Sequence, residues 1–260
     1  LGREDNFWGP AGKAGPCGPC SEMFYDNIEI WNDVFMEYNK LADGNYEPLK
    51  QKNVDTGMGV ERTVAVLSGK KSVYDIEPLK SIVGAIKKLA KTYDERSARI
   101  IADHLRAATF IMGDEKGIAP SNVEQGYVLR RLIRRAIRYG KKIGIEKSFT
   151  HEIGKLVIEL MSDEYPELGK NKDFVIEQLI QEEEKFGKTL EKGLKEFEDF
   201  VLRRKVKRGK IGVAYDQGIL YGDDAFYLYQ SFGFPKEMTQ ELCREKNIKF
   251  DEKEFEEEFK

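Results

Sequence analysis

The 260-residue sequence contains few of the residues that build disulfide scaffolds or metal sites: three cysteines and two histidines. A small, odd number of cysteines excludes a disulfide framework and is typical of a reducing compartment. No apolar run approaches the roughly 18 residues that a membrane span needs. Residues 1–5 are not followed by the apolar segment of a secretory signal peptide. We therefore expect a cytoplasmic protein with no membrane partner.

The sequence also lacks a methionine at position 1, which is typical of a chain that begins inside a longer protein. Its length allows one large domain or two smaller ones. Hydrophobic residues make up 40% of the chain and charged residues 34%. This composition excludes extended disorder and predicts a folded protein with a highly charged surface.

Charge is unevenly distributed, although the net charge is only -3. Acidic residues cluster at 182–184 and 251–258, whereas residues 130–142 contain seven basic side chains and no acidic one. A solvated helix face usually mixes both signs of charge, so we favour phosphate binding over an ordinary solvated face. Such binding should weaken as the salt concentration rises. Five arginines form one broad helical stripe: Arg130, Arg131, Arg134, Arg135 and Arg138.

Residues 1–72 have the patterns of strands and loops. Glycine and proline crowd residues 9–19, which predicts a loop. Aromatic and β-branched residues predict strands at 22–25 and 28–35, and a turn at 42–45 followed by a returning strand at 46–52 predicts a hairpin. The glycines of residues 55–59 predict a second turn, which leads into a helix that starts at 60–67.

From about residue 73 onward the apolar periodicity is helical. The spacing near 3.5 between residues 176 and 200 predicts one long amphipathic helix. A loop is expected at 113–125, and glycines at 222 and 233 bracket a shorter element. The composition changes near Gly69, so we predict an α+β protein with strands and loops in residues 1–72 and a mainly helical domain in 73–260.

The segment Asp55-Thr56-Gly57-Met58-Gly59-Val60-Glu61-Arg62 is the most specific candidate for binding chemistry. Glycines before a helix let the backbone approach a phosphate or an adenine ring closely, because no Cβ obstructs it. An arginine on that helix can pair with a phosphate through two hydrogen bonds. By itself the pattern is weak, and an ordinary turn with a surface arginine is the more common interpretation.

Segments on both sides of this pattern make it specific. Before it stand Asp5-Asn6-Phe7-Trp8, Gly15-Pro16-Cys17-Gly18-Pro19-Cys20-Ser21-Glu22 and Glu29-Ile30-Trp31-Asn32-Asp33-Val34-Phe35-Met36; after it stand Pro120-Ser121-Asn122 and Gly126-Tyr127-Val128-Leu129-Arg130-Arg131-Leu132-Ile133-Arg134-Arg135. In this order the segments closely resemble the alanyl-tRNA synthetases, a family of class II aminoacyl-tRNA synthetases. The glycine–arginine segment resembles motif 3 of that class. The resemblance covers nearly the whole chain and weakens between about residues 145 and 219.

The resemblance implies that residues 1–72 are the C-terminal part of the class II aminoacylation core and form part of its antiparallel sheet. It also implies that residues 73–260 are a helical tRNA-recognition domain. It implies the ATP-dependent activation of alanine to alanyl-adenylate and transfer of the alanyl group to tRNA(Ala). In the alanine pocket, Trp8 would form a wall, Asn32 and Val34 the floor, Asp55 would bind the ammonium group, and Gly57 would let the substrate approach the backbone.

The same resemblance implies an ATP site that binds the nucleotide together with Mg²⁺. Arg62 would hold the γ-phosphate, and Gly59 would lie against the nucleotide. Glu29 would bind the nucleotide or its magnesium ion. Arg62 and Asp55 are the residues to which we assign the catalytic roles.

For the RNA, the resemblance places the arginine stripe against the tRNA acceptor stem, where a G·U wobble pair is read. Asn122 matches the asparagine that reads this pair, and a side-chain amide can donate and accept hydrogen bonds in an RNA minor groove. The second reader of the family is an aspartate after Leu-Tyr, and this chain has Gln230 there. Glutamine keeps an acceptor but loses the charge that strengthens a bond to a guanine amine.

Cys17-x-x-Cys20 invites a zinc or redox interpretation. A tetrahedral zinc site needs four ligands, and the other candidates, Cys243, His104 and His151, are scattered. No thioredoxin-like pattern surrounds the cysteines either. We therefore predict a rigid turn and no metal site, and we interpret His104 as a structural side chain.

Motifs 1 and 2 precede motif 3 in class II enzymes, and there is no room for them before Leu1. We therefore expect that this chain is inactive alone and is completed by the missing N-terminal half of the synthetase. The alternative is a stand-alone tRNA-binding module with a vestigial half-site. The five residues of the implied alanine and ATP sites favour the first interpretation, because a pure binding module has no use for an alanine pocket: Trp8, Asn32, Asp55, Gly57 and Arg62.

Overall fold

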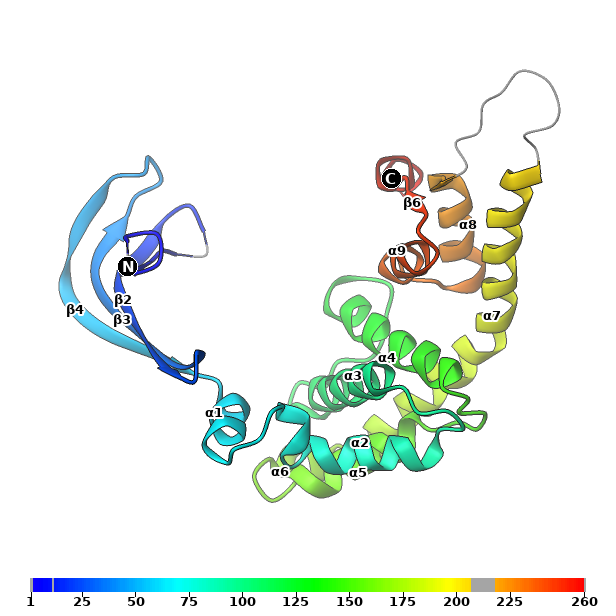
Figure 1. Ribbon diagram of the computed structural model, residues 1–260, viewed down its shortest axis with the longest axis horizontal. Coiled ribbons are helices and arrows are strands. Elements are labelled where there is room, and N and C mark those ends of the chain that lie inside the picture. Colours follow the sequence, from blue (N-terminus) through cyan, green and yellow to red (C-terminus); the bar gives the residue numbers. More distant parts are fainter. Residues whose placement is uncertain (1, 11, 207–217, 260) are drawn as a thin grey trace. The chain divides into compact units, whose positions relative to one another are not determined.

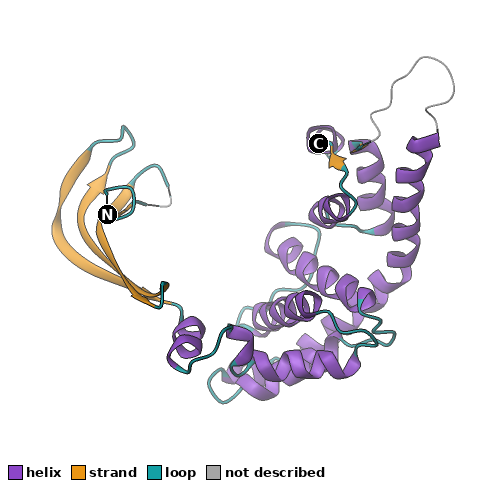
Figure 2. Ribbon diagram, in the orientation of Figure 1, coloured by secondary structure: helices purple, strands orange, loops and turns teal. Residues whose placement is uncertain are grey.

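The computed structural model describes residues 2–10, 12–206 and 218–259. The chain divides into two compact units, Leu1–Lys80 and Ser81–Lys260, which we call the sheet unit and the helical unit. The first is built mainly of strands and the second mainly of helices (Figures 1 and 2). This confirms the predicted α+β class. The roles predicted for residues 1–72 and 73–260 stay predictions.

The sheet unit contains an antiparallel meander in which each strand pairs with the next, in the order β1-β2-β3-β4. The strands are β1 (Phe7–Trp8), β2 (Gly15–Tyr25), β3 (Ile28–Lys40) and β4 (Tyr46–Met58). Asp26 and Asn27, which join β2 to β3, both have positive φ angles, 48° and 62°. This geometry matches the twist of a two-residue hairpin, and asparagine and aspartate tolerate it best after glycine.

Two local predictions for this unit were wrong. Residues 15–19 lie in β2, not in a loop, and β4 continues through Met58, where a turn was expected. Glycine in a local sequence usually predicts a turn, but these glycines lie within strands that pair with their neighbours. A Cβ at Gly18 would lie 1.8 Å from the carbonyl oxygen of Phe35, so only glycine lets β2 and β3 approach there. Gly57 pairs with Asn32 of β3.

Helix α1 (Val60–Leu67) follows β4 directly, as the sequence predicts, and the 3-10 turn η1 (Val73–Asp75) follows α1. Helix α2 (Leu79–Leu89) begins two residues before the boundary between the units. The helical unit then continues with α3 (Glu95–Gly113), α4 (Glu124–Lys142), α5 (Thr150–Met161), α6 (Pro166–Lys170), α7 (Lys172–Val206), α8 (Gly222–Phe232), α9 (Lys236–Glu245) and α10 (Glu252–Glu258). Short parallel strands β5 (Ile219–Leu220) and β6 (Lys249–Phe250) pair beside α8 and α10.

The long amphipathic helix predicted from residue 176 to residue 200 is α7, and the element bracketed by two glycines is α8. Helix α8 packs along α7 (Figure 1). It ends at Gly233, which has a φ of 71°, a left-handed conformation that glycine adopts without strain.

The core of the helical unit lies where α3, α4, α5 and α7 meet. Leu105 of α3, Leu129 and Ile133 of α4, and Leu179 and Phe186 of α7 are almost completely buried. Each such side chain contributes about 1.5–3 kcal/mol of hydrophobic stabilisation. The periodic apolar residues of the sequence therefore decide which helix faces pack together.

A buried carboxylate ties α7 to the start of α5. Glu183 accepts hydrogen bonds from the backbone N–H groups of Phe149 and Thr150, at 3.1 and 3.0 Å, and from the Thr150 hydroxyl at 2.7 Å. The first N–H groups of a helix have no partner within the helix, and a negative charge is favourable there. Glu183 thereby caps α5 from a helix more than thirty residues away in the sequence.

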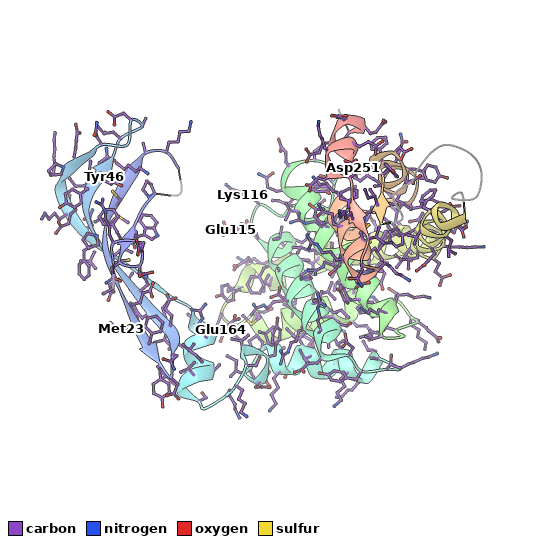
Figure 3. The ribbon with its side chains drawn as sticks, turned by 45° about the horizontal axis from the view of Figure 1, so that its top comes forward. Met23, Tyr46, Glu115, Lys116, Glu164 and Asp251 are labelled. Atoms are coloured by element: carbon purple, nitrogen blue, oxygen red, sulfur yellow. The ribbon has the colours of Figure 1, made fainter. Side chains whose placement is uncertain are left out.

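The sheet unit leaves an unusual amount of apolar surface exposed. Met23 and Tyr46, which lie near opposite ends of the sheet (Figure 3), are 51% and 42% exposed. Exposed apolar patches of this extent on a folded unit mark surfaces that bind other protein or ligand. The further large apolar side chains that are exposed are Trp8, Phe24, Tyr25, Ile28, Trp31, Phe35, Val54, Met58, Val60, Val64 and Leu67.

Candidate functional site

Four residues of the implied alanine pocket lie on neighbouring positions of β3 and β4. Asn32 is paired with Gly57, and Val34 is paired with Asp55. Paired residues of antiparallel strands share a face, and so do residues two apart in one strand. All four therefore lie on one face of the sheet. Val34 is buried, Asn32 is half-buried, and Asp55 is exposed.

Strand β2 adds a carboxylate to this face that the sequence did not single out as a site residue. Glu22 is paired with Asn32, and its Oε1 accepts a hydrogen bond of 3.3 Å from Asn32 Nδ2. Trp8, on β1, is paired with Gly18 and is 41% exposed. No local pattern distinguishes Glu22 from other acidic residues, because its partner comes from strand pairing.

The glycine nearest the implied substrate has no structural reason to be glycine. A Cβ at Gly57 would meet no other atom within 4 Å, and Gly57 is not among the residues with positive φ. Neither the packing of the residues that the structure describes nor backbone strain requires glycine at this position. The open space above Gly57 is available to a ligand.

Two of the three residues implied in ATP binding, Arg62 and Glu29, contact one another. Gly59 is the N-cap of α1, and Arg62 lies in the first turn of that helix. Arg62 Nη1 donates to the carbonyl oxygen of Glu29 at 2.9 Å and lies 3.8 Å from the Glu29 carboxylate. Both side chains are substantially exposed, at 51% and 39%. An exposed ion pair is weak, so an anionic ligand can compete for Arg62.

In the helical unit, Asn122 and Gln230 line the same cavity, of about 330 Å³. We call it the α4–α8 cavity. The two residues are more than one hundred positions apart in the sequence, and both were predicted to contact the tRNA. Asn122 and Gln230 are exposed, whereas Arg130 and Arg134 form part of the wall. The other lining residues are Tyr127, Lys185, Thr189, Tyr229, Ser231, Phe232, Gly233 and Pro235.

The loop that carries Asn122 is fixed against the start of α4. Ser121 donates its backbone N–H to the carbonyl oxygen of Gly126 at 3.0 Å, and its hydroxyl donates to the carbonyl oxygen of Val123 at 2.9 Å. A Cβ at Gly126 would lie 2.2 Å from Ser121 Oγ. Gly126 therefore allows the close approach that holds Asn122 at the cavity.

The arginine stripe of α4 is paired with carboxylates of α7 and α9. Glu182 of α7 is 5% exposed and lies 2.6 Å from Arg134 Nε and 3.2 Å from Arg130 Nε. Arg134 also donates to the carbonyl oxygen of Gly233, and its guanidinium group stacks 4.9 Å from the ring centre of Phe186. The absence of acidic residues from positions 130–142 is thus compensated by partners from distant helices.

Helix α9 binds the remaining arginines. Glu241 accepts hydrogen bonds from Arg135 at 2.7 Å, from Arg138 at 2.9 Å and from the Tyr139 hydroxyl at 2.6 Å. Arg131 pairs with Glu237 at 2.6 Å. We call these contacts, together with those of Glu182, the arginine network. Phosphate contact by the five arginines stays a prediction, and the structure adds their role in joining helices.

Glu241 has the strongest electrostatic perturbation among these carboxylates. Burial alone would raise its pKa, but hydrogen bonds from Arg135 and Tyr139, with the charges of Arg135 and Arg138, outweigh burial and lower the pKa to about 2. The ordinary value is 4.5. A carboxylate whose pKa is lower in the folded state stabilises that state above its ordinary pKa.

We therefore expect acid to remove the contribution of Glu241. It is complete above about pH 5 and is lost as the pH falls toward 2, with a total on the order of 3 kcal/mol. Urea unfolding of the wild type and of Glu241→Gln, measured from pH 7 to pH 2, checks this. The difference in free energy of unfolding between the two proteins should shrink as the pH falls, and a constant difference contradicts the prediction.

His104 lies beside the arginine network, and the three cysteines are free and buried. His104 Nε2 lies 2.9 Å from Arg135 Nη1, at the edge of the arginine network. Burial raises the pKa of the Cys243 thiol to about 12 and that of Cys20 above its usual range. Across residues 2–10, 12–206 and 218–259, no three histidine, cysteine, aspartate or glutamate side chains are grouped to hold a metal ion.

None of the helices described here is long and apolar enough to cross a membrane.

Comparison with known proteins assigns the whole chain to one family. Residues 1–260 match the family described as tRNA synthetases class II (A). Three proteins named alanine–tRNA ligase, from Borrelia hermsii, Treponema pallidum and Thermotoga petrophila, are 45%, 43% and 41% identical over 100%, 96% and 98% of this chain. The chain spans 46%, 44% and 31% of their lengths, about half or less. This chain belongs to the class II (A) family of tRNA synthetases.

Proposed function

We propose that the chain is part of an alanine–tRNA ligase, which activates alanine with ATP and transfers it to tRNA(Ala). The observation that carries the proposal is the placement of Asn32, Val34, Asp55 and Gly57 on one sheet face, next to the pair of Arg62 and Glu29. The names of the relatives support the same activity. A face with a carboxylate, an amide and open backbone next to an arginine suits an amino acid beside a nucleotide.

In the proposed reaction, the carboxylate of alanine attacks the α-phosphate of ATP and pyrophosphate leaves. Asp55 holds the ammonium group of alanine, and Asn32 and Val34 form the floor beneath it. Trp8 closes the side of the pocket, and Gly57 leaves room for the substrate. Holding the two reactants in this orientation removes much of the entropic barrier of a bimolecular step.

Two anions must approach one another in this step, so positive charge on the phosphates is essential. Arg62 turns from Glu29 to the γ-phosphate, and Gly59 lets the nucleotide lie against the backbone. The carboxylate of Glu29 is the hard oxygen ligand that Mg²⁺ prefers, and this ion commonly uses one or two carboxylates together with substrate phosphates. Bound Mg²⁺ spreads the negative charge of the phosphates.

We further propose that the α4–α8 cavity recognises the acceptor stem of tRNA(Ala). Asn122 and Gln230 are the exposed amides at this cavity, and amides suit the shallow minor groove of an RNA helix. The sequence assigned both residues to a G·U wobble pair, and their common cavity supports that assignment. Lys185, also exposed at this cavity, supplies a positive charge for the phosphate backbone of the RNA.

We also propose that this chain needs further polypeptide for activity. It spans half or less of the compared relatives, and its sheet exposes many large apolar side chains. An ATP–pyrophosphate exchange assay with alanine tests this. We expect no exchange by the chain alone, and exchange with charging of tRNA(Ala) when the N-terminal portion of the synthetase is added. Exchange by the chain alone would refute incompleteness, and tRNA binding that is never accompanied by exchange would favour a binding module.

A further inference from the structure

Arg130 is held by three different groups at the wall of the α4–α8 cavity. Its Nη1 donates to Oδ1 of Asn122, and its Nη2 donates to the carbonyl oxygen of Pro120 at 3.1 Å. Its Nε lies 3.2 Å from the buried carboxylate of Glu182. The side chain of Arg130 is only 12% exposed. Two of its nitrogens therefore donate to protein oxygens, whereas Nε lies within ion-pair distance of Glu182 but makes no hydrogen bond among the described residues.

The contact with Asn122 determines how that amide is oriented. A guanidinium group can only donate hydrogen bonds, so the Asn122 atom facing it must be the oxygen. The Nδ2 amino group is therefore turned away from Arg130. Because Asn122 is exposed and lines the α4–α8 cavity, its outward group is a hydrogen-bond donor.

We propose that Arg130 is a positioning residue, which orients the amide of Asn122 so that Asn122 offers N–H donors to the RNA. The inference rests on the proposed recognition of the acceptor stem. Glu182 holds Arg130 from behind, and Pro120 fixes it to the loop of Asn122. The contacts of Arg130 with Glu182 and with Asn122 thus fix the Asn122 amide relative to α7.

The orientation also assigns complementary roles to the two amides. The Nδ2 group of Asn122 seeks an acceptor in the minor groove, such as the pyrimidine O2, the purine N3 or a ribose hydroxyl. Gln230 lies on α8 and, among the residues that the structure describes, makes no hydrogen bond to an arginine. In this proposal it supplies the acceptor for the guanine amino group. The donor of Asn122 is fixed, whereas the amide of Gln230 can adapt. Together they distinguish a G·U pair from a G·C pair by where the base pair places its hydrogen-bond acceptors.

A double-mutant cycle tests this role with RNA hairpins that carry the acceptor-stem sequence of tRNA(Ala), with either G·U or G·C at the discriminating pair. The measured quantity is the ratio of the two affinities, by fluorescence anisotropy. Asn122→Asp keeps an oxygen for Arg130 but removes the N–H donors, whereas Arg130→Gln frees the amide. Each should reduce the G·U preference by about fivefold, the effect of losing one hydrogen bond. The double variant should lose no more than either single variant.

Lys141→Gln is the matched control, because Lys141 is a cation of the same helix that pairs with Glu191 and not with Asn122. It should keep the G·U preference. A wild-type chain with no preference refutes acceptor-stem recognition itself. A wild-type preference that survives in Arg130→Gln, or additive losses in the double variant, overturns the positioning role. If Arg130→Gln does not fold, Asn122→Asp provides the test. A G·U preference that this variant retains excludes a donating amide at Asn122.

Discussion

Replacing Glu182 with alanine is expected to lower the free energy of unfolding of the helical unit by about 3–5 kcal/mol. Glu182 is 5% exposed and is the carboxylate partner of both Arg130 and Arg134. Burial lowers the pKa of the Arg134 guanidinium, and the charge of Glu182 opposes this effect. Without Glu182, two nearly buried positive charges face one another with no anion between them. The measurement is urea-induced unfolding followed by circular dichroism.

Glu184→Ala is the control for this experiment, since Glu184 lies on the same helix but is exposed. Exposed substitutions away from such networks usually change the free energy of unfolding by no more than about 0.5 kcal/mol. Equal stabilities of Glu182→Ala and Glu184→Ala would contradict the ion-pair account of α4 and α7. Rearrangement of Arg130 and Arg134 toward solvent would then be the physical explanation.

Replacing Arg62 with alanine is expected to reduce ATP–pyrophosphate exchange by about 10²–10³-fold, the usual effect of removing one group that stabilises transition-state charge. The assay uses a form of the protein that supports exchange. Arg62→Lys should recover only part of the rate, because an ammonium group cannot form the two parallel hydrogen bonds that a guanidinium group makes with a phosphate.

Loss of activity in Arg62→Ala should not reflect unfolding. The side chains of Arg62 and Glu29 are 51% and 39% exposed, so their ion pair contributes little to stability. Lys70→Ala, a nearby exposed change in the same unit, should leave both exchange and stability unchanged. Exchange rates of Arg62→Ala within a fewfold of the wild type would refute the γ-phosphate role.

The elements that could be predicted are those whose signal lies within one segment. The apolar spacing of residues 176–200 is visible without tertiary contacts, and α7 confirms it. Helix α1 likewise begins where the sequence places it. The errors arose at glycines, where the same residue serves a turn or a close strand contact. Both segments form strands, because Gly57 pairs with Asn32 and Phe35 closely approaches Gly18.

The candidate sites divide in the same way. The sequence by itself determined the family, the glycine–arginine segment and the residue types of the proposed alanine pocket, because motifs and their order can be seen without tertiary contacts. Only the tertiary structure decided which charges meet. Arg134 and Arg135 find Glu182 and Glu241 at separations of 48 and 106 residues, and Gln230 reaches the cavity of Asn122 through the packing of α8 on α7. An ion pair forms only between groups a few ångströms apart in space. The periodicity of residues along the chain does not reveal which distant residues come that close together.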